Sequence, residues 1–342
     1  MTCAFPPSIG GIESMADLLA HEFVAAGHGV EVVASNPGSA AAGGGRPFRV
    51  HYQPGPWQRA AIFARCDCIL QLGFGLKAIW PNLFTGKPVV VSHQGLYNPR
   101  DPATRAVDKL KNKVAGWFAN VAASGAVARN LPAGTTVIPN CFDPVAFAPE
   151  PASAGVERHG LVCVARLVRD KGVDLLIDAV ALLRERGLSP GVTIVGDGPE
   201  LGPLKEQVAN LGLAEQVTFV GPKNRQQVAA EFRRHRVAVV PSRYEEAFGI
   251  VALEAMAAGC VVVASDRGGL PEAVGPGGML FDPAHPASLV DALTVTLQPG
   301  GHEGRDPEAV RLHLARHTGK AAAGHYLQVL QERVGTVRRS TH

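Results

Sequence analysis

Residues 241–269 read PSRYEEAFGIVALEAMAAGCVVVASDRGG, and this stretch determines the fold class that we predict. Residues 237–240 before it and residues 261–264 within it are short runs of valine and alanine, which are typical of buried parallel strands. Between these runs, Phe248 and Gly249 open a predicted helix that extends to about residue 258. A strand, a helix and a second strand in this order predict an α/β protein with a parallel sheet.

The joint between the acidic loop and this helix carries the candidate chemistry. A helix N-terminus presents unpaired N–H groups and a partial positive charge, so the main chain of Phe248, Gly249 and Ile250 is a candidate phosphate site. Glu246 lies just before the helix, and Glu254 follows eight residues later. A carboxylate such as Glu254 on so apolar a helix is costly to bury unless hydroxyls or cations meet it. Sugar and ribose hydroxyls are natural partners; the alternative is a solvated loop acid and an exposed helix acid.

The same stretch resembles the signature of the retaining GT-B glycosyltransferases of the group-1 type (family four). The matching pattern is PS-x-x-E-E-A-F-G-I-V-x-L-E-A-M-A-x-G followed by VVVAS-x-x-GG-x-x-E, and its Glu-x7-Glu element falls on Glu246 and Glu254. The resemblance implies that Glu246 contacts the donor sugar and that Glu254 binds the donor ribose. It implies that the main chain of residues 248–250 holds the diphosphate. It also implies two facing, Rossmann-like, doubly wound domains with the donor in the cleft between them.

Length and composition fit a protein of two globular domains. The chain has 342 residues, of which 46% are hydrophobic and 18% are charged. Its net charge of +3 is too small to predict a nucleic acid as the partner. The six cysteines are scattered or, at Cys66 and Cys68, too close for an ordinary zinc site, so we expect reduced thiols. No membrane-spanning run or signal peptide is visible, so we expect a cytoplasmic protein with at most peripheral membrane contact.

The start of the chain predicts a short strand, a glycine loop and a helix. The strand over residues 2–5 is clipped to about four residues, and a helix is expected over residues 12–26. Gly10 and Gly11 precede this helix, where glycine lets the main chain approach a phosphate or a sugar. A tight turn alone is the alternative. The resemblance implies that Gly10 and Gly11 face the donor diphosphate across the cleft.

His93 follows a predicted strand over residues 88–92. Open α/β sheets keep their sites beyond the carboxyl ends of the strands, so this position is suited to face a cleft. A histidine after a strand is more often structural than catalytic. By the resemblance, His93 lies near the transferred sugar and is a candidate catalytic residue.

Residues 100–118 predict an amphipathic helix with a basic side. The apolar face is formed by Val107, Leu110, Val114, Trp117 and Phe118, and three lysines, Lys109, Lys111 and Lys113, lie off it. One interpretation is a helix packed on its own domain with solvated lysines. The other is contact of residues 105–118 with an anionic acceptor or a membrane surface.

The second half opens with a predicted strand over residues 161–165, followed by R-L-V-R-D-K-G. Arg166 and Lys171 flank the loop between this strand and the next helix, where two cations neutralise a diphosphate leaving group. Solvent-exposed charge is the alternative. The family pattern R-L-x-x-x-K-G implies the active role, and the resemblance places the main chain near Lys223 against the nucleobase.

We therefore predict an acceptor-side domain over residues 1–148, a donor-nucleotide domain over 149–317, and a helix over 318–336 that packs back on the first domain. The resemblance implies transfer of a sugar, with retention, from a UDP- or GDP-sugar to a glycan, a lipid-linked acceptor or a small molecule, in glycan, lipopolysaccharide or glycolipid biosynthesis. No DxD-type motif is placed near the site, so we expect no metal and no cofactor. Two other functions stay open, namely a sugar-nucleotide epimerase on the same fold and a non-catalytic subunit that binds nucleotide sugars.

Overall fold

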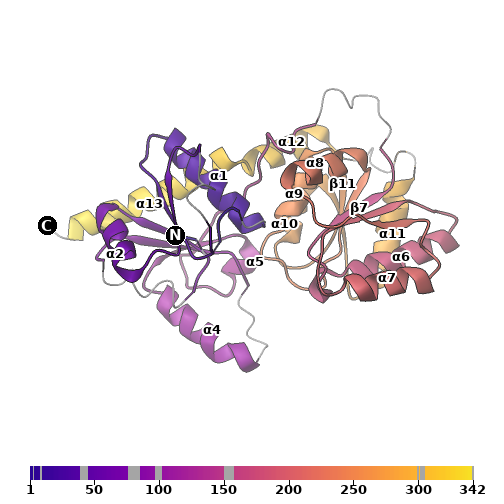
Figure 1. Cartoon of the computed structure of the whole chain (residues 1–342), viewed down its shortest axis with the longest axis horizontal. Helices are drawn as coiled ribbons and strands as arrows, with labels where there is room; N and C mark the ends of the chain where they lie inside the picture. The colour runs from indigo at the N-terminus through magenta and orange to yellow at the C-terminus, as the bar shows by residue number, and fades with distance from the viewer. Residues whose placement is uncertain are drawn as a thin grey trace. The chain divides into compact units, whose positions relative to one another are not determined.

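The chain forms two compact units. The computed structural model describes residues 1–2, 4–7, 10–38, 45–75, 85–96, 102–149, 158–298, 300 and 305–340, without the side chains of 102–105 and 337–340. Unit 1 consists of Met1–Phe142 and His317–His342, and unit 2 of Asp143–Arg316. Each unit contains parallel sheet covered by helices, so the α/β class expected from the sequence is confirmed (Figure 1).

Unit 2 is built on a six-stranded parallel sheet with the order β12-β11-β10-β7-β8-β9. Its strands are β7 (Leu161–Val164), β8 (Val192–Val195), β9 (Val217–Phe219), β10 (Val237–Val240), β11 (Val261–Ser265) and β12 (Gly278–Phe281). Its helices are η4 (Arg169–Lys171), α6 (Val173–Glu185), α7 (Leu201–Asn210), α8 (Arg225–Arg234), α9 (Ile250–Ala257), α10 (Leu270–Val274), η5 (Gly275–Gly277), α11 (Pro286–Leu297) and α12 (Pro307–Arg316). The chain adds strands outward from β7 to β9, returns to β10 beside β7, and then continues to β12. The strand order therefore reverses between β7 and β10, and ligands of open α/β sheets bind beyond the strand ends at such a reversal.

Unit 1 holds a two-stranded sheet and a four-stranded sheet. The first pairs β1 (Glu31–Ala34) with β2 (Arg49–Tyr52), and the second has the order β3 (Ile69–Leu72), β4 (Val89–His93), β5 (Ala119–Ala122) and β6 (Thr136–Val137). Its helices are α1 (Gly11–Ala25), α2 (Pro56–Arg65), α4 (Pro102–Ala115), α5 (Gly125–Ala128) and α13 (Gly319–Ser340). The strand expected over residues 2–5 is reduced, within the described residues, to bridges from Thr2 to Ala34 and to Leu72. These bridges join the two sheets.

Alternating side chains of the strands supply two cores on opposite faces of unit 1. Val32 and Val90 belong to a cluster with helices α1 and α13, whereas Val33 and Val91 belong to a cluster with α2. Successive residues of a strand point to opposite faces, so this division follows directly from the sequence order. Strand β4 accordingly begins with three consecutive buried valines, because both of its faces are covered.

The boundary between the units lies earlier than the sequence suggested, between Phe142 and Asp143 rather than after residue 148. The main-chain N–H of Phe142 donates to the carbonyl of His317, at 3.0 Å, within unit 1. Asp143 instead accepts a hydrogen bond from Arg225 at 3.0 Å, and Arg233 donates to two carbonyls of residues 146–148. Residues 143–148 are thus held to α8 of unit 2.

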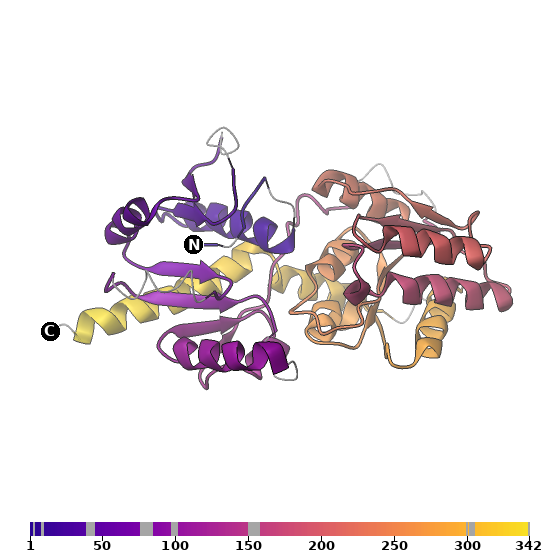
Figure 2. The same ribbon diagram turned by 60° about the horizontal axis from the view of Figure 1, so that its bottom comes forward.

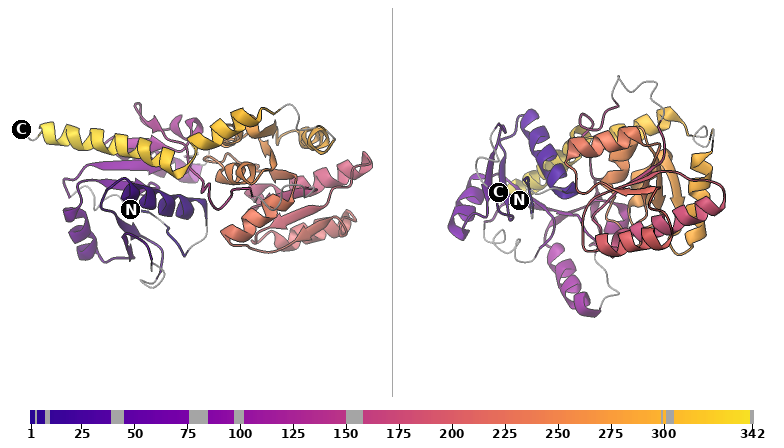
Figure 3. Two further views of the ribbon diagram at one scale, coloured as in Figure 1. Left: turned by 90° about the horizontal axis from the view of Figure 1, so that it is seen from above. Right: turned by 45° about the vertical axis from the view of Figure 1, so that its right-hand side comes forward.

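Helix α13 returns to unit 1 at the end of the chain (Figure 2, Figure 3). Tyr326 on this helix is 1% exposed, and its hydroxyl lies 2.7 Å from the hydroxyl of Ser92 on β4. Ala322, Ala323 and Leu330 join the same core. A hydrogen bond and an apolar face therefore fix the helix to the sheet.

Helix α4 and the turn that follows it leave some of their apolar side chains uncovered. Val107, Leu110 and Trp117 are 46%, 51% and 59% exposed, whereas Val114 and Phe118 pack against the core on the α2 side. Only part of the face that we expected to pack on its own domain therefore does so. No helix among the described residues combines the length and the apolar character needed to cross a bilayer.

We predict that Tyr326→Phe lowers the free energy of unfolding by about 1 kcal/mol, because it removes a buried hydrogen bond and keeps the ring. The measurement is urea unfolding followed by circular dichroism. Tyr244→Phe is the control, because Tyr244 is 60% exposed. Equal stability of the Tyr326 variant and the wild type would contradict the anchoring role of this contact.

Candidate functional site

The loops that follow β7 and β10 meet at the reversal of strand order in unit 2. Lys171 lies in the first loop, and its Nζ atom is 2.5 Å from Oε1 of Glu246 in the second. Both side chains keep partial access to solvent, at 29% for Lys171 and 20% for Glu246. The structure therefore brings together two of the residues that the sequence singled out.

The main chain fixes the loop after β7 closely. Gly172 has a φ angle of +63°, and a Cβ atom there would lie 2.0 Å from the carbonyl oxygen of Pro241. The N–H of Leu167 donates to the carbonyl of Asp197 at 2.9 Å. A Cβ on Gly198 would lie 2.3 Å from the carbonyl oxygen of Leu167. Gly198, to which the sequence gave no site role, therefore lets the chain beside Asp197 pack closely against the main chain of this loop.

Glu246 is held from several directions. Its Oε1 atom accepts a hydrogen bond from Ser242 Oγ at 2.5 Å in addition to the contact from Lys171. Its main-chain oxygen accepts from the N–H of Gly269 at 2.7 Å. The Oε2 atom makes no hydrogen bond to any part of the chain that the structure describes. Oε1 of the carboxylate is thus fixed by two donors, while Oε2 has no such contact within the described residues.

Close main-chain packing beside Glu246 explains the glycines of the turn after β11. Gly268 has a φ angle of +61°, and a Cβ atom there would lie 2.2 Å from the carbonyl oxygen of Glu246. Helix α9 begins at Ile250 after Gly249, whose φ angle is +103° and which supplies no side-chain cap. Phe248 is 1% exposed and anchors the loop in the core. The helix N-terminus therefore starts directly beside Glu246, as the sequence predicts.

Glu254 lies one turn into α9 and is partly buried. Burial raises the pKa of its carboxyl to about 7, against the opposing field of Arg225, while Asp143 adds to the rise. Arg225 is itself paired with Asp143 at 3.0 Å. Glu254 is therefore an acid in an environment that favours its neutral form unless donors reach it.

The remaining cations of unit 2 differ in their surroundings. Arg166 is exposed, and its side chain has no hydrogen bond or ion pair within the described residues. Lys223 reaches toward α8, where its Nζ lies 3.3 Å from Oε1 of the buried Glu231. The Lys223 side chain is thus engaged in unit 2, which leaves its main chain as the part available to a ligand.

The unit 1 residues of the expected site lie at the ends of its strands and helices. Gly10 is the N-cap of α1 and Gly11 its first residue, and a Cβ on Gly10 would lie 2.4 Å from a carboxylate oxygen of Glu13. His93 ends β4, is fully buried, and has its Nε2 atom 2.8 Å from Oδ1 of Asn120. Burial lowers the pKa of His93, and the bond with Asn120 opposes this shift. The histidine expected to face a cleft is therefore packed inside the sheet layer.

Two contacts that the sequence did not reveal reinforce the loops of unit 2. Arg243 forms an ion pair with Asp174, and its main-chain N–H donates to the carbonyl of Asp170 at 2.9 Å. These contacts run beside the contact of Lys171 with Glu246 and join the same two loops. The motif places Ser242 and Arg243 directly before the acidic loop, but nothing in the sequence names their partners.

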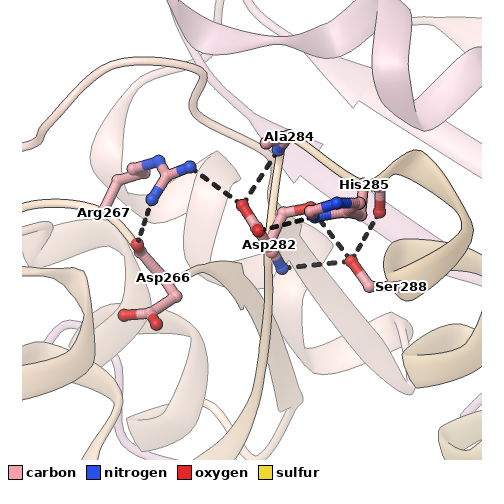
Figure 4. A network of polar contacts seen from close by, with 6 residues as sticks. All are labelled: Asp266, Arg267, Asp282, Ala284, His285 and Ser288. Carbon is pink, nitrogen blue, oxygen red and sulfur yellow. Dashed lines mark hydrogen bonds and ion pairs between the residues drawn. The ribbon is translucent and has the colours of Figure 1, made fainter.

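A second network ties the turn after β11 to the loop after β12 (Figure 4). Arg267 Nη2 donates to Asp282 Oδ1 at 2.8 Å, and His285 Nδ1 lies 2.8 Å from Asp282 Oδ2. The N–H of Ala284 and the His285 ring hold the pKa of the Asp282 carboxyl below its usual range. Ser288 Oγ bonds the main chain of Asp282 and His285. The network braces Arg267, which precedes the glycine turn that packs on Glu246.

The histidine, cysteine and acidic side chains of the described residues are the groups that could bind a metal or, for cysteine, form a disulfide. No group of three or more His, Cys, Asp or Glu side chains gathers there in a way that could hold a metal ion. The five described cysteines are free thiols, and burial raises the pKa of Cys163 and Cys260 to about 12. Buried thiols of this kind are inert rather than nucleophilic.

Comparison with known proteins identifies the family that unit 2 resembles. Residues 152–303 match the family of glycosyl transferases group 1. Over 196 residues, the chain is 37% identical to a GDP-mannose-dependent alpha-(1-6)-phosphatidylinositol monomannoside mannosyltransferase of Mycolicibacterium smegmatis. This matched stretch covers 53% of this chain and 48% of the relative. Over 231 residues, it is 35% identical to a D-inositol 3-phosphate glycosyltransferase of Stackebrandtia nassauensis, and this stretch covers 61% of this chain and 52% of the relative. The chain thus matches about half the length of each of these curated relatives.

The fold agrees with solved structures over nearly the whole chain. A structure of the Anabaena protein HepE in complex with UDP and glucose superposes with a TM-score of 0.72 and 21% identity, covering 98% of both chains. A likeness at this level of identity establishes the fold. The chain therefore has the GT-B fold, and residues 152–303, which carry Lys171, Glu246 and Glu254, match the group 1 glycosyl transferases.

Proposed function

We propose that the protein is a retaining GT-B glycosyltransferase of the group-1 (family four) type, which moves a sugar from a UDP- or GDP-sugar to an acceptor hydroxyl. The contact of Lys171 with Glu246 carries this proposal, because it places a cation and a carboxylate beside the N-terminus of α9. Phosphates favour such a helix end, and sugar hydroxyls favour a carboxylate. The family match of residues 152–303 supports the same activity.

The proposed reaction breaks the bond between the anomeric carbon of the donor and its diphosphate oxygen. The acceptor oxygen forms the new bond on the same face, and its proton passes to the leaving phosphate. Negative charge grows on the diphosphate, and Arg166, Lys171 and the N–H groups at Gly249 and Ile250 are proposed to stabilise it. Because two side-chain cations serve this purpose, we propose that transfer needs neither a metal nor another cofactor.

The donor is proposed to bind along the edge that runs from the β7 loop to α9. Glu246 Oε2 is proposed to accept a sugar hydroxyl, Glu254 the ribose hydroxyls, and the main chain near Lys223 the nucleobase. Gly10, Gly11 and His93 of unit 1 are proposed to contribute to donor binding. For His93 this role requires a conformational change that exposes the ring, because the ring is fully buried against Asn120.

The acceptor is proposed to be a phosphate-bearing or lipid-linked molecule that meets unit 1. The relatives named above act on a phosphatidylinositol mannoside and on inositol 3-phosphate, which both carry phosphate. Val107 and Leu110 of helix α4, and Trp117 just after its end, are exposed apolar side chains, and Lys109 and Lys113 of the helix are exposed as well. We propose that residues 105–118 contact an anionic membrane surface peripherally from the cytoplasmic side.

Lys171→Ala and Glu246→Ala are each expected to lower donor turnover by about 100-fold or more, because each removes a charged group of the proposed site. Turnover is measured as release of GDP or UDP from GDP-mannose and UDP-glucose, first with water as the acceptor. The exposed neighbours Arg169→Ala and Glu245→Ala are the matched controls. Near-normal turnover in both site variants would reject the proposal, and interconversion of sugar epimers without transfer would favour an epimerase.

Glu254→Gln is expected to stabilise the protein at pH 8.5 and to have little effect at pH 5. A carboxyl whose folded pKa is raised from 4.5 to about 7 costs stability once the pH rises through this window. The gain at pH 8.5 should reach up to about 3.5 kcal/mol, from about 2.5 pKa units at about 1.4 kcal/mol per unit. Urea unfolding at both pH values measures it, with Glu245→Gln as the exposed control. A gain that is equal at both pH values would contradict the raised pKa.

A variant with Leu110→Ser and Trp117→Ser is expected to bind anionic vesicles about tenfold more weakly, since it loses two apolar contacts with the bilayer. Co-sedimentation with vesicles of phosphatidylglycerol and phosphatidylcholine measures this binding. Trp57→Ser is the control, because Trp57 is 89% exposed elsewhere on unit 1. Unchanged binding, or an equal loss in the Trp57 variant, would rule out α4 as the contact.

A further inference from the structure

Ser242 is a small buried residue in contact with the carboxylate of the proposed donor site. It lies two residues beyond β10, is 2% exposed, and places its Oγ atom 2.5 Å from Oε1 of Glu246. This is the one hydrogen bond of the Ser242 hydroxyl within the described residues. The hydroxyl does not cap α9, whose N-cap is Gly249. Its role is therefore tied to Glu246.

Two groups of very different freedom hold the same oxygen atom of Glu246. Lys171 is a long cation whose side chain is 29% exposed. A lysine ammonium is mobile on its stem and can exchange one anion for another. Ser242 has a single side-chain torsion before its hydroxyl and is enclosed by the core. When a diphosphate attracts Lys171, the serine can keep its bond while the lysine leaves.

We propose that Ser242 is a positioning residue that fixes Glu246 Oε1 while Lys171 turns to the donor diphosphate. The remaining oxygen, Oε2, is thereby kept in place for a hydroxyl of the donor sugar. This inference rests on the donor site proposed above. It assigns Ser242 to recognition of the sugar and not of the nucleotide, and this separation makes it testable.

The experiment compares the affinities for a nucleoside diphosphate and for the corresponding sugar nucleotide. Calorimetry with GDP and GDP-mannose, and with UDP and UDP-glucose, is carried out on the wild type, Ser242→Ala and Ser242→Thr. We expect Ser242→Ala to leave the affinity for the diphosphate within about twofold and to weaken sugar-nucleotide binding about tenfold, as loss of a bond to a charged group implies. Ser242→Thr keeps the hydroxyl and should restore most of the sugar-nucleotide affinity.

Ser265→Ala provides the matched control. Ser265 ends β11, the strand beside β10, is fully buried, and its Oγ atom has no hydrogen-bond partner in the described structure. Its loss should change neither affinity. An unchanged ratio of the two affinities in Ser242→Ala, or equal weakening of both ligands, would overturn the positioning role. Failure of all four ligands to bind the wild type would instead overturn the donor site itself.

Discussion

The contact between Lys171 and Glu246 is the interaction on which the proposed site depends. It joins the loops after β7 and β10, the two neighbouring strands between which the strand order of unit 2 reverses. Opposite charges in a partly desolvated edge stabilise each other only when further groups satisfy them. Ser242 supplies one such bond to Glu246, and the parallel pair of Arg243 with Asp174 holds the loops together. The loops of the proposed site are thus held together by contacts within the protein itself.

The sequence predicts the strand and the helix that flank the acidic loop, because local residue patterns determine them. The predicted strand over residues 237–240 is β10, and the helix predicted to begin near Phe248 and to end near residue 258 is α9. Local apolar runs and glycine positions determine such elements. The partners of Arg243 could not be predicted, because Asp170 and Asp174 are distant from it in sequence. Ser242 and its partner Glu246 are only four residues apart, but the residue types of a loop do not show which side chains turn toward each other. Burial of His93 depends likewise on Asn120 of the neighbouring strand.

The function proposed here rests more on unit 2 than on unit 1. Unit 2 carries the family match and the paired charges, whereas unit 1 differs from expectation at its first strand, at His93 and along α4. A donor common to many enzymes constrains the loops that would hold its diphosphate. An acceptor that varies between enzymes constrains its binding residues less, and under the proposed function the exposed side chains of α4 belong to this acceptor side.

The most direct test of the donor site is calorimetric titration of GDP, UDP, ADP and TDP, in buffer with EDTA, into the wild type and into Glu254→Ala. We expect that one nucleotide binds clearly without divalent metal and that the variant loses at least most of this affinity. Absence of binding by all four, or equal binding by the variant, would contradict the proposal that α9 and the loops beside it form a nucleotide-sugar site.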